Sequence, residues 1–119
     1  MSSRAEREAQ GRRGENIAAW YLRLNGWRIL ARRVKTARGE IDLIARRGRV
    51  VAFVEVKWRR SAAELDHAID SWRLRRVAAA SEAVAHRFVR PGDDQRIDVV
   101  LIAPRRWPRR ITNAWQPGA

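Results

Sequence analysis

The chain has 119 residues, no cysteine and a formal net charge of +13. A chain of this length is expected to form one domain, residues 1–119, and the lack of cysteine excludes a disulfide scaffold and a thiolate zinc site. No apolar run approaches the roughly 20 residues of a membrane-spanning helix, so we expect a cytoplasmic protein with no membrane partner. The charge favours nucleic acid as the partner, and the sequence leaves a homodimer open.

A first helix is predicted near residues 3–25. Ser3 and Glu6 have capping-box spacing, an apolar stripe follows, and Asn25-Gly26 ends the pattern. The stripe consists of Ala5, Ala9, Ile17, Ala18, Tyr21, Leu22 and Leu24. Glu15 follows a glycine inside this helix, and from the sequence alone it is best interpreted as a solvated helix charge.

Three strands are predicted next, over residues 27–34, 39–46 and 50–59. A polar connection at 35–38 separates the first two, and a glycine-containing turn at 46–49 joins the second and third into a β-hairpin. The third strand is apolar on both faces, which predicts a place at the centre of the sheet.

Four charged side chains stand out in this apolar hairpin: Glu40, Asp42, Glu55 and Lys57. If Ala45 faces Val50, alternation places all four on one face. Asp42 and Glu55 are then diagonal neighbours with Cα atoms roughly 7–8 Å apart, within reach of one divalent ion. Lys57 is one of only two lysines in the chain, which favours a specific role for its ammonium group. The alternative is an ordinary ion pair between Glu55 and Lys57 on an exposed strand end.

The second half begins with an ambiguous segment, residues 61–70, which is either a short helix or a loop. His67 lies there and is best interpreted as a polar loop residue. A second helix then begins at a Ser71 cap, and its outward arginines either contact phosphate or form a solvated face. Its apolar face is Leu74, Val77, Ala78, Ser81, Val84, Ala85 and Phe88, and its outward arginines are Arg73, Arg75, Arg76 and Arg87.

A turn at 91–94 leads to a strand over residues 96–103, on which Asp98 is expected to pair with a neighbouring arginine. A last strand is predicted over residues 110–115, and residues 116–119 are expected to fray. Residues 105–110, RRWPRR, mix cations with an aromatic side chain. This segment either contacts nucleic acid or forms a solvated loop with its tryptophan docked on the core.

The element order predicts an α/β fold in which helices pack against a mixed sheet. Carboxylates that converge at one end of such a sheet, in a basic protein, suit phosphodiester hydrolysis. Mg2+ held by one or two carboxylates polarises a phosphoryl oxygen and activates water, and Lys57 on the same face could orient that water or neutralise charge on the phosphate.

The same residues carry a resemblance to a known family. The spacing of Asp42 to Glu55-Val56-Lys57 resembles the D…(D/E)-x-K signature of the PD-(D/E)XK nuclease superfamily. More closely, RRGE at 12–15, GEIDLIA at 39–45 and FVEVK at 53–57 resemble the YraN-like family of small bacterial endonuclease-like proteins. IDVVLI at 97–102 and ITNAW at 111–115 are similar to its closing strands.

The resemblance implies a restriction-endonuclease-like core of order αβββαβ, and DNA rather than RNA as substrate. It makes Asp42 and Glu55 ligands of Mg2+ or Mn2+, one or two ions, Lys57 the catalytic lysine and Glu15 the helix carboxylate that completes the site. Glu40 then lies beside the metal ligands and pairs with an arginine. We expect phosphate contacts from Arg12, Arg13, Arg59, Arg60 and Arg73. Arg33 and Arg73 stand where the family typically has asparagine and lysine.

Three functions follow as hypotheses. The first is a metal-dependent endonuclease that hydrolyses DNA phosphodiester bonds, branched or otherwise structured DNA included. The second is a nucleic-acid-binding module that keeps the fold without catalysis. The third is a protein-interaction domain in which the charged cluster is a structural ion network.

Overall fold

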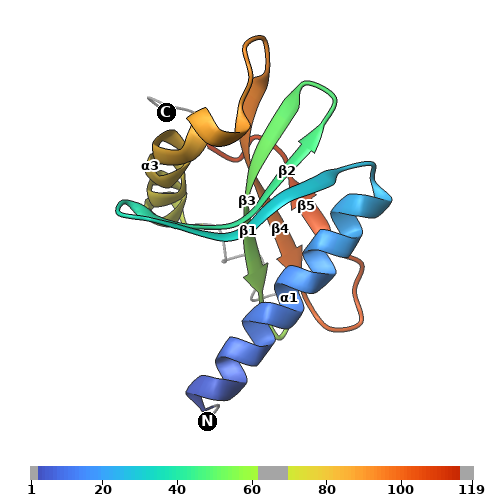
Figure 1. Ribbon diagram of the computed structural model, residues 1–119. Coiled ribbons are helices and arrows are strands. Elements are labelled where there is room, and N and C mark those ends of the chain that lie inside the picture. The colour runs from blue at the N-terminus through green and yellow to red at the C-terminus, as the bar shows by residue number, and fades with distance from the viewer. Residues whose placement is uncertain (1–2, 62–69, 116–119) are drawn as a thin grey trace.

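The computed structural model describes residues 3–61 and 70–115. It confirms the α/β fold and the expected order αβββαβ, to which a short fifth strand is added (Figure 1). The elements are α1 (Arg4–Leu24), β1 (Arg28–Thr36), β2 (Gly39–Arg47), β3 (Val50–Trp58), α3 (Ser71–Phe88), β4 (Asp94–Ile102) and β5 (Arg109–Ile111). In the described part of the chain, no helix combines the length and the hydropathy needed to cross a membrane.

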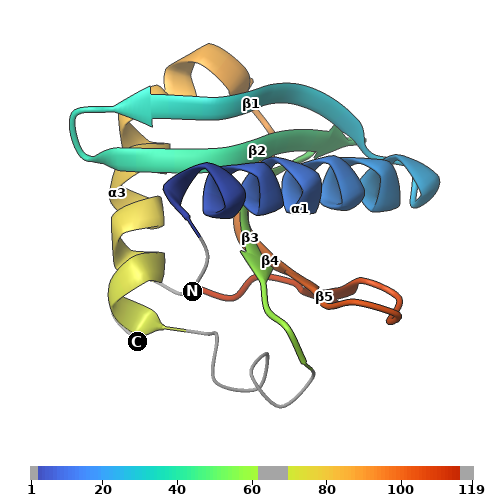
Figure 2. The ribbon, with the colours of Figure 1, turned by 90° about the horizontal axis from the view of Figure 1, so that it is seen from below.

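The five strands form one mixed sheet in the order β1-β2-β3-β4-β5. Only β3 and β4 pair in parallel, and the other neighbours are antiparallel. The predicted central place of β3 is therefore confirmed. Figure 2 shows α1 crossing one face of the sheet, while α3 lies on the other side.

Helix α1 begins as predicted, because the Ser3 side chain accepts a hydrogen bond of 3.1 Å from the backbone amide of Glu6. Its buried face consists of small residues and one leucine: Gly14, Ala18, Ala19 and Leu22. Small side chains let the helix lie close to the alanine and valine side chains of β2 and β3. The predicted stripe was wrong at Ala5 and Leu24, which are exposed.

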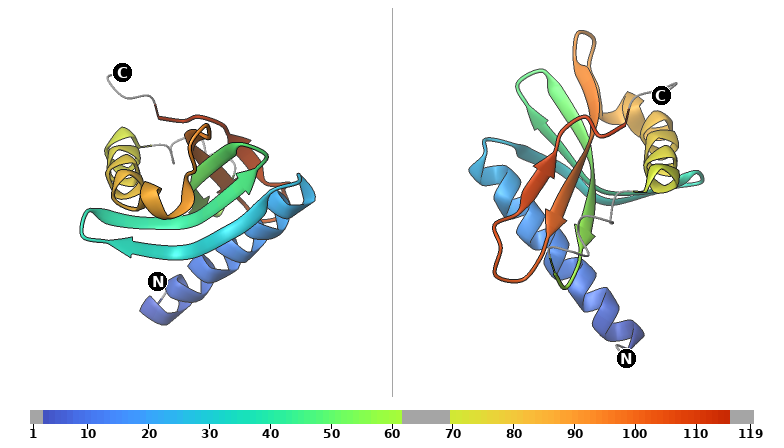
Figure 3. Two further views of the ribbon diagram at one scale, coloured as in Figure 1. Left: turned by 45° about the horizontal axis from the view of Figure 1, so that its top comes forward. Right: turned by 180° about the vertical axis from the view of Figure 1, so that it is seen from behind.

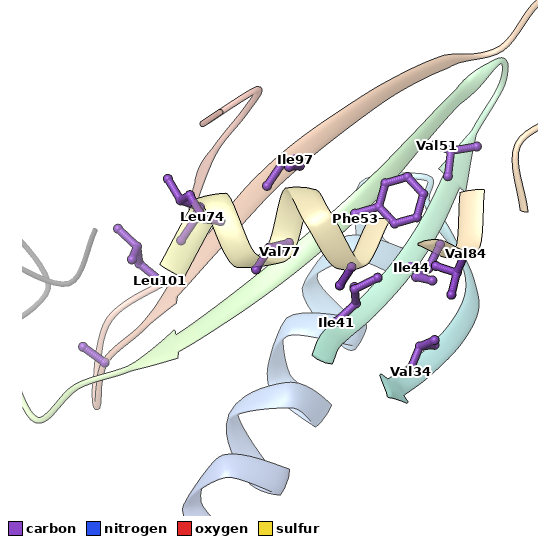
Figure 4. Close-up of a cluster of buried hydrophobic side chains, with 13 residues drawn as sticks. Val34, Ile41, Ile44, Val51, Phe53, Leu74, Val77, Val84, Ile97 and Leu101 are labelled. Carbon is purple, nitrogen blue, oxygen red and sulfur yellow. The ribbon is translucent and has the colours of Figure 1, made fainter. Parts of the chain in front are cut away.

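Helix α3 covers the opposite face with the predicted periodicity, and Figure 4 shows Leu74, Val77 and Val84 against the sheet. The predicted cap was one residue too late. The Asp70 side chain accepts from the backbone amide of Trp72 at 2.9 Å, so Ser71 is the first helical residue. The arginines expected to point outward are exposed: Arg73, Arg75, Arg76 and Arg87.

The register of β2 and β3 differs from the prediction by two residues, since Ala45 pairs with Ala52 and not with Val50. The reason is a two-residue loop, Gly48-Arg49, in which Gly48 has φ +61°. A tight hairpin loop needs a positive φ that glycine adopts without strain. A shift of two residues keeps every side chain on its predicted face.

The remaining boundaries differ modestly. Strand β1 continues to Thr36, β4 begins at Asp94, and the last strand covers only Arg109–Ile111 in place of residues 110–115. It ends early because the chain turns at Asn113, whose φ is +52° and whose amide donates to the Asp98 carboxylate at 2.9 Å. The expected pairing of Asp98 with an arginine is confirmed by Arg96. The expectations for His67 and for residues 116–119 lie outside the described residues.

Candidate active site at the divergence of β2 and β3

The candidate site forms where β2 and β3 separate. Their ladder runs from Arg47–Val50 to Leu43–Val54, and beyond it β1 and β2 turn toward α3 while β3 continues straight (Figure 1). At the point of separation, the backbone amide of Val56 donates to Oδ2 of Asp42 at 2.8 Å. A carboxylate thus takes the place of a ladder carbonyl and fixes Asp42 beside β3.

A hollow of about 420 Å³ opens at this divergence. One wall carries three of the predicted carboxylates: Glu40, Asp42 and Glu55. The other wall is the first turns of α3: Trp72, Arg73, Arg76 and Val77. The structure therefore brings the acidic hairpin face, as predicted from alternation, against a basic helix end.

Glu55 and Lys57 form a buried ion pair within the same strand. Nζ of Lys57 lies 2.9 Å from Oε1 of Glu55, and the two side chains are only 5% and 6% exposed. Arg73 adds a contact of 3.3 Å from Nη2 to the same oxygen. The exposed ion pair that was the alternative interpretation is therefore wrong, because both groups are buried.

Burial also lowers the pKa of Lys57, since desolvation disfavours the ammonium form. The contact with Glu55 opposes that shift, and the charges of Arg73 and Arg59 reinforce it. A lysine whose pKa is lowered gives up its proton more readily than a surface lysine.

Asp42 is a partly buried carboxyl with a raised pKa. Burial raises its pKa to about 7, and the charges of Glu55 and Glu15 and a hydrogen bond with Glu55 act in the same direction. The hydrogen bond from the Val56 amide opposes the shift, and the charge of Arg33 also interacts favourably with Asp42. Within residues 3–61 and 70–115, no cation lies within ion-pair distance of the Asp42 carboxylate.

Glu15 approaches the site from α1 and is held by an arginine. Nε of Arg33 lies 2.6 Å from its Oε1, and the Glu15 side chain is 14% exposed, which corrects the sequence-only interpretation as a solvated charge. Arg33 has a φ of +50°, a left-handed backbone that arginine rarely adopts. Glu40, which was expected to pair with an arginine, is exposed, and its charge contributes to raising the pKa of Arg33.

The donor set suits a hard divalent cation with few protein ligands. Among the described residues, no group of three or more histidine, cysteine, aspartate or glutamate side chains is arranged to hold a metal. Mg2+ does not require one, because it is commonly bound through one or two carboxylates and retains several waters. Asp42 and Glu55 are close enough to form a hydrogen bond with each other. Their oxygens therefore lie side by side, and carboxylate oxygens are the ligands that Mg2+ prefers.

The predicted phosphate-binding arginines fall into two groups. Arg73 lines the hollow, and Arg59 lies close enough for its charge to lower the pKa of Lys57. Arg12 and Arg13 are exposed on α1, one helical turn before Glu15, and Arg60 is exposed after β3. Arg59 also donates to the carbonyl of Trp58 at 2.7 Å, which holds it against the strand end.

Arg76, one of the arginines for which phosphate contact was left open, lines the hollow. Sequence reasoning missed two residues near the site. Trp72 lines the hollow, and its signal was an aromatic side chain at the basic start of the second helix. The other is Gly14, where an added Cβ would lie only 3.0 Å from Cδ1 of Trp58. This close approach explains a glycine inside α1 and lets the helix carry Glu15 up to the end of β3.

A larger hollow, of about 610 Å³, lies between α3, β4 and the residues that follow β5. Its lining includes Phe53, Ile97 and Trp115, and the one acidic side chain among the described lining residues, Glu82, pairs with Arg38. Size alone would favour this hollow, but its chemistry does not suit a metal. The smaller hollow is lined by three carboxylates, one of which pairs with the buried Lys57, and it is the candidate active site.

Comparison with known proteins decides the family. The model described as "Uncharacterised protein family UPF0102" matches residues 14–102, three quarters of the chain. The chain belongs to the UPF0102 family. This family corresponds to the YraN-like proteins that the sequence resembles. The matched region includes Glu15, Asp42, Glu55 and Lys57.

Bacterial UPF0102 proteins are similar along almost the whole chain. One from Sphingopyxis alaskensis is 64% identical over 115 residues, which cover 97% of this chain and 99% of the relative. One from Erythrobacter litoralis is 66% identical over 110 residues, covering 92% and 95%. One from Rhizorhabdus wittichii is 61% identical over 115 residues, covering 97% and 98%.

Proposed function

We propose that this UPF0102 protein is a Mg2+-dependent endonuclease of the PD-(D/E)XK type that hydrolyses DNA phosphodiester bonds. The observation that carries the proposal is the hollow at the divergence of β2 and β3, where the partly buried Asp42 carboxyl lies beside Glu55, which is itself paired with the buried Lys57. Among residues 3–61 and 70–115 no cation pairs with this carboxyl, although the chain has a net charge of +13, so the site is suited to an external cation.

In this proposal Asp42 and Glu55 hold the metal, which when bound would polarise a phosphoryl oxygen and activate water. The Lys57 ammonium, held 2.9 Å from Oε1 of Glu55, neutralises charge that develops on the phosphate as the water attacks phosphorus and the P–O bond breaks. Arg73 and Arg76, at the start of α3, bind the phosphates on either side. Glu15, kept in place by Arg33, orients water from the α1 side.

A titration of Mg2+ and of Mn2+ tests the proposal. We expect wild type to be stabilised by either ion in thermal unfolding and to cleave duplex, single-stranded or branched DNA. Asp42→Asn should lose the metal-dependent stabilisation and about a thousandfold in cleavage rate, because a charged metal ligand is removed. Asp94→Asn is the matched control, since it makes the same change at an exposed aspartate beside Val50, at the opposite end of β3.

A second candidate is a nucleic-acid-binding module without catalysis. The observation in its favour is the contact between Arg33 and Glu15, which already neutralises the third carboxylate of the site. Salt-sensitive DNA binding with no cleavage in either ion would favour this module, whereas cleavage that depends on Asp42 excludes it.

A further inference from the structure

Three aromatic side chains form a surface patch that the proposed chemistry does not use. The ring of Trp107 lies edge-on to Trp20, with centroids 5.6 Å apart, and to Tyr21, with centroids 6.2 Å apart. Trp107 is 67% exposed and Trp20 is 50% exposed. Tryptophan is usually well buried, so two adjacent exposed indoles indicate a contact surface. We call Trp20, Tyr21 and Trp107 the aromatic patch.

The loop between β4 and β5 holds Trp107 in this position. Its sequence is Pro104-Arg105-Arg106-Trp107-Pro108, and the two prolines restrict its backbone. Pro108 is buried, and the amide of Arg106 donates to the carbonyl of Ala103 at 3.4 Å. The rings are therefore presented by a constrained loop and a helix, which lowers the entropy cost of ordering them on a ligand.

The aromatic patch lies at the same end of the sheet as the candidate active site, on the face covered by α1, whereas the hollow opens on the side of α3. Trp58, next to Lys57, pairs with Ile102, and the amide of Arg59 donates to the Ile102 carbonyl at 3.0 Å. The loop that carries Trp107 leaves β4 directly after this residue and runs beside α1, as the right view of Figure 3 shows. Helix α1 also links the two places, because Glu15 and Trp20 are separated by a rise of only about 7.5 Å.

The charge around the aromatic patch identifies the class of ligand. Arg105 and Arg106 precede Trp107 and are exposed, and Arg23 is exposed on the helix turn after Trp20. Exposed indoles bordered by guanidinium groups are the combination that binds unpaired nucleotides, with bases on the rings and phosphates on the cations. A closed duplex hides its base faces and cannot use the rings.

We propose that the aromatic patch is a stacking platform for unpaired bases, so that the ligand is nucleic acid with a single-stranded segment next to the bond in the active site. The inference rests on the proposed nuclease function, because only that function places a scissile phosphodiester bond in the active site. Binding to the platform itself needs neither metal nor cleavage, and the two can be tested apart.

The test measures fluorescence anisotropy of a short labelled oligothymidylate and of a blunt duplex, both in EDTA. Trp107→Ala should weaken oligothymidylate binding about tenfold, because one base loses its stacking partner, and should leave duplex binding within about twofold. Trp107→Phe should keep most of the affinity, whereas Trp107→Leu, apolar but without a π face, should lose it. The dependence on salt should not change, because no cation is removed.

The platform would be overturned if Trp107→Ala weakened binding of the oligothymidylate and of the duplex equally. It would also be overturned if Trp107→Leu bound the oligothymidylate as tightly as Trp107→Phe. A change in sedimentation on Trp107→Ala, with oligothymidylate binding intact, would assign the aromatic patch to contact between two copies of the chain instead. If wild type never cleaves but the Trp107 series behaves as expected, the nuclease proposal fails and the platform stands. If wild type cleaves and the Trp107 substitutions have no effect on oligothymidylate binding, the platform proposal fails and the nuclease proposal remains.

Discussion

Two aspartates at opposite ends of the sheet have opposite electrostatic environments. Asp93, in the turn before β4, is 6% exposed and accepts from Nη2 of Arg46 and from the amide of Arg90, each at 2.7 Å. The hydrogen bond from Arg46, reinforced by the Arg90 amide, lowers its pKa to about 2. Asp42, at the divergence of β2 and β3, has a pKa raised to about 7 by burial and by neighbouring carboxylates.

The difference separates a structural carboxylate from a candidate functional one. Where Asp93 only holds a turn, the chain supplies an arginine and a backbone donor. Where Asp42 meets Glu55, Lys57 and Arg73 both bond to Glu55, and in the described part of the chain no cation forms an ion pair with Asp42. A buried carboxylate without a cation costs stability, and such costs are concentrated at functional sites.

Among the variants that keep both carboxylates, the largest expected effect comes from Lys57. Lys57→Met keeps the side-chain length and removes the ammonium, so cleavage at saturating Mg2+ should fall by about 100- to 1000-fold, as when one donor to a developing anion is lost. Stabilisation by Mg2+ in thermal unfolding should remain, because both carboxylates remain. If Lys57→Met lost the stabilisation by Mg2+ as well as the cleavage rate, Lys57 would belong to the metal site and not to the chemical step.

Glu55 and Asp42 should respond in opposite directions when their charge is removed. Glu55→Gln leaves the buried Lys57 without its ion-pair partner, and we expect a loss of about 2 kcal/mol in the free energy of unfolding. The measurement is urea denaturation near neutral pH without metal. A neutral or stabilising effect would mean that Arg73 and solvent already compensate Lys57.

Asp42→Asn should stabilise the metal-free protein by about 1–2 kcal/mol at about pH 8, because it removes an uncompensated charge and keeps an acceptor for the Val56 amide. The folded pKa of Asp42 is raised from 3.8 to about 7, so the folded state binds the extra proton between these values. Wild-type stability therefore falls as pH rises from about 4 to 7, and the advantage of the variant should disappear below about pH 4.

Asp93→Asn is the control with the reverse sign. Its folded pKa is lowered from 3.8 to about 2, so its contribution is present above pH 3.8 and is lost as pH falls toward 2. The variant should be less stable than wild type at neutral pH, and the two should converge in acid. If both variants showed the same pH trend in urea unfolding, the comparison of the two aspartates would be wrong.

The smallest expected effects come from two glycines of the helix that carries Glu15. An added Cβ at Gly11 meets nothing within 4 Å, so Gly11→Ala should stabilise by about 1 kcal/mol through helix propensity. At Gly14 the Cβ would lie 3.0 Å from Trp58, and the overpacking should outweigh the propensity and destabilise by about 1 kcal/mol. Urea unfolding of the pair measures both, and stabilisation by Gly14→Ala would contradict the close approach of α1 to β3.

Most of the fold was predictable because its signals are local. The Ser3 cap, the alternating hairpin strands and the apolar β3 follow from short-range stereochemistry and from burial on both faces. The hairpin register was not obtained, although its signal was present in the glycine at the first position of a two-residue loop. The helix cap moved to Asp70 because aspartate and serine cap about equally well, and the sequence does not rank them.

The candidate site was predictable only in part. Alternation placed Glu40, Asp42 and Glu55 on one face, and the two-residue register error preserved it. The contact of Glu15 with Arg33 joins residues 18 positions apart and depends on a left-handed backbone at an arginine, which no local pattern indicates. The approach of Gly14 to Trp58 and the position of α3 over the hollow are likewise products of tertiary packing.

The hydrogen bond from the Val56 amide to Asp42 has a spectroscopic consequence. In a regular ladder this proton would lie against a neutral carbonyl, whereas here it lies 2.8 Å, nitrogen to oxygen, from a group whose charge changes near neutral pH. Its chemical shift and its exchange with solvent should therefore follow the charge of that carboxyl. A single backbone resonance can thus record protonation or cation binding at the divergence of β2 and β3 with no DNA present.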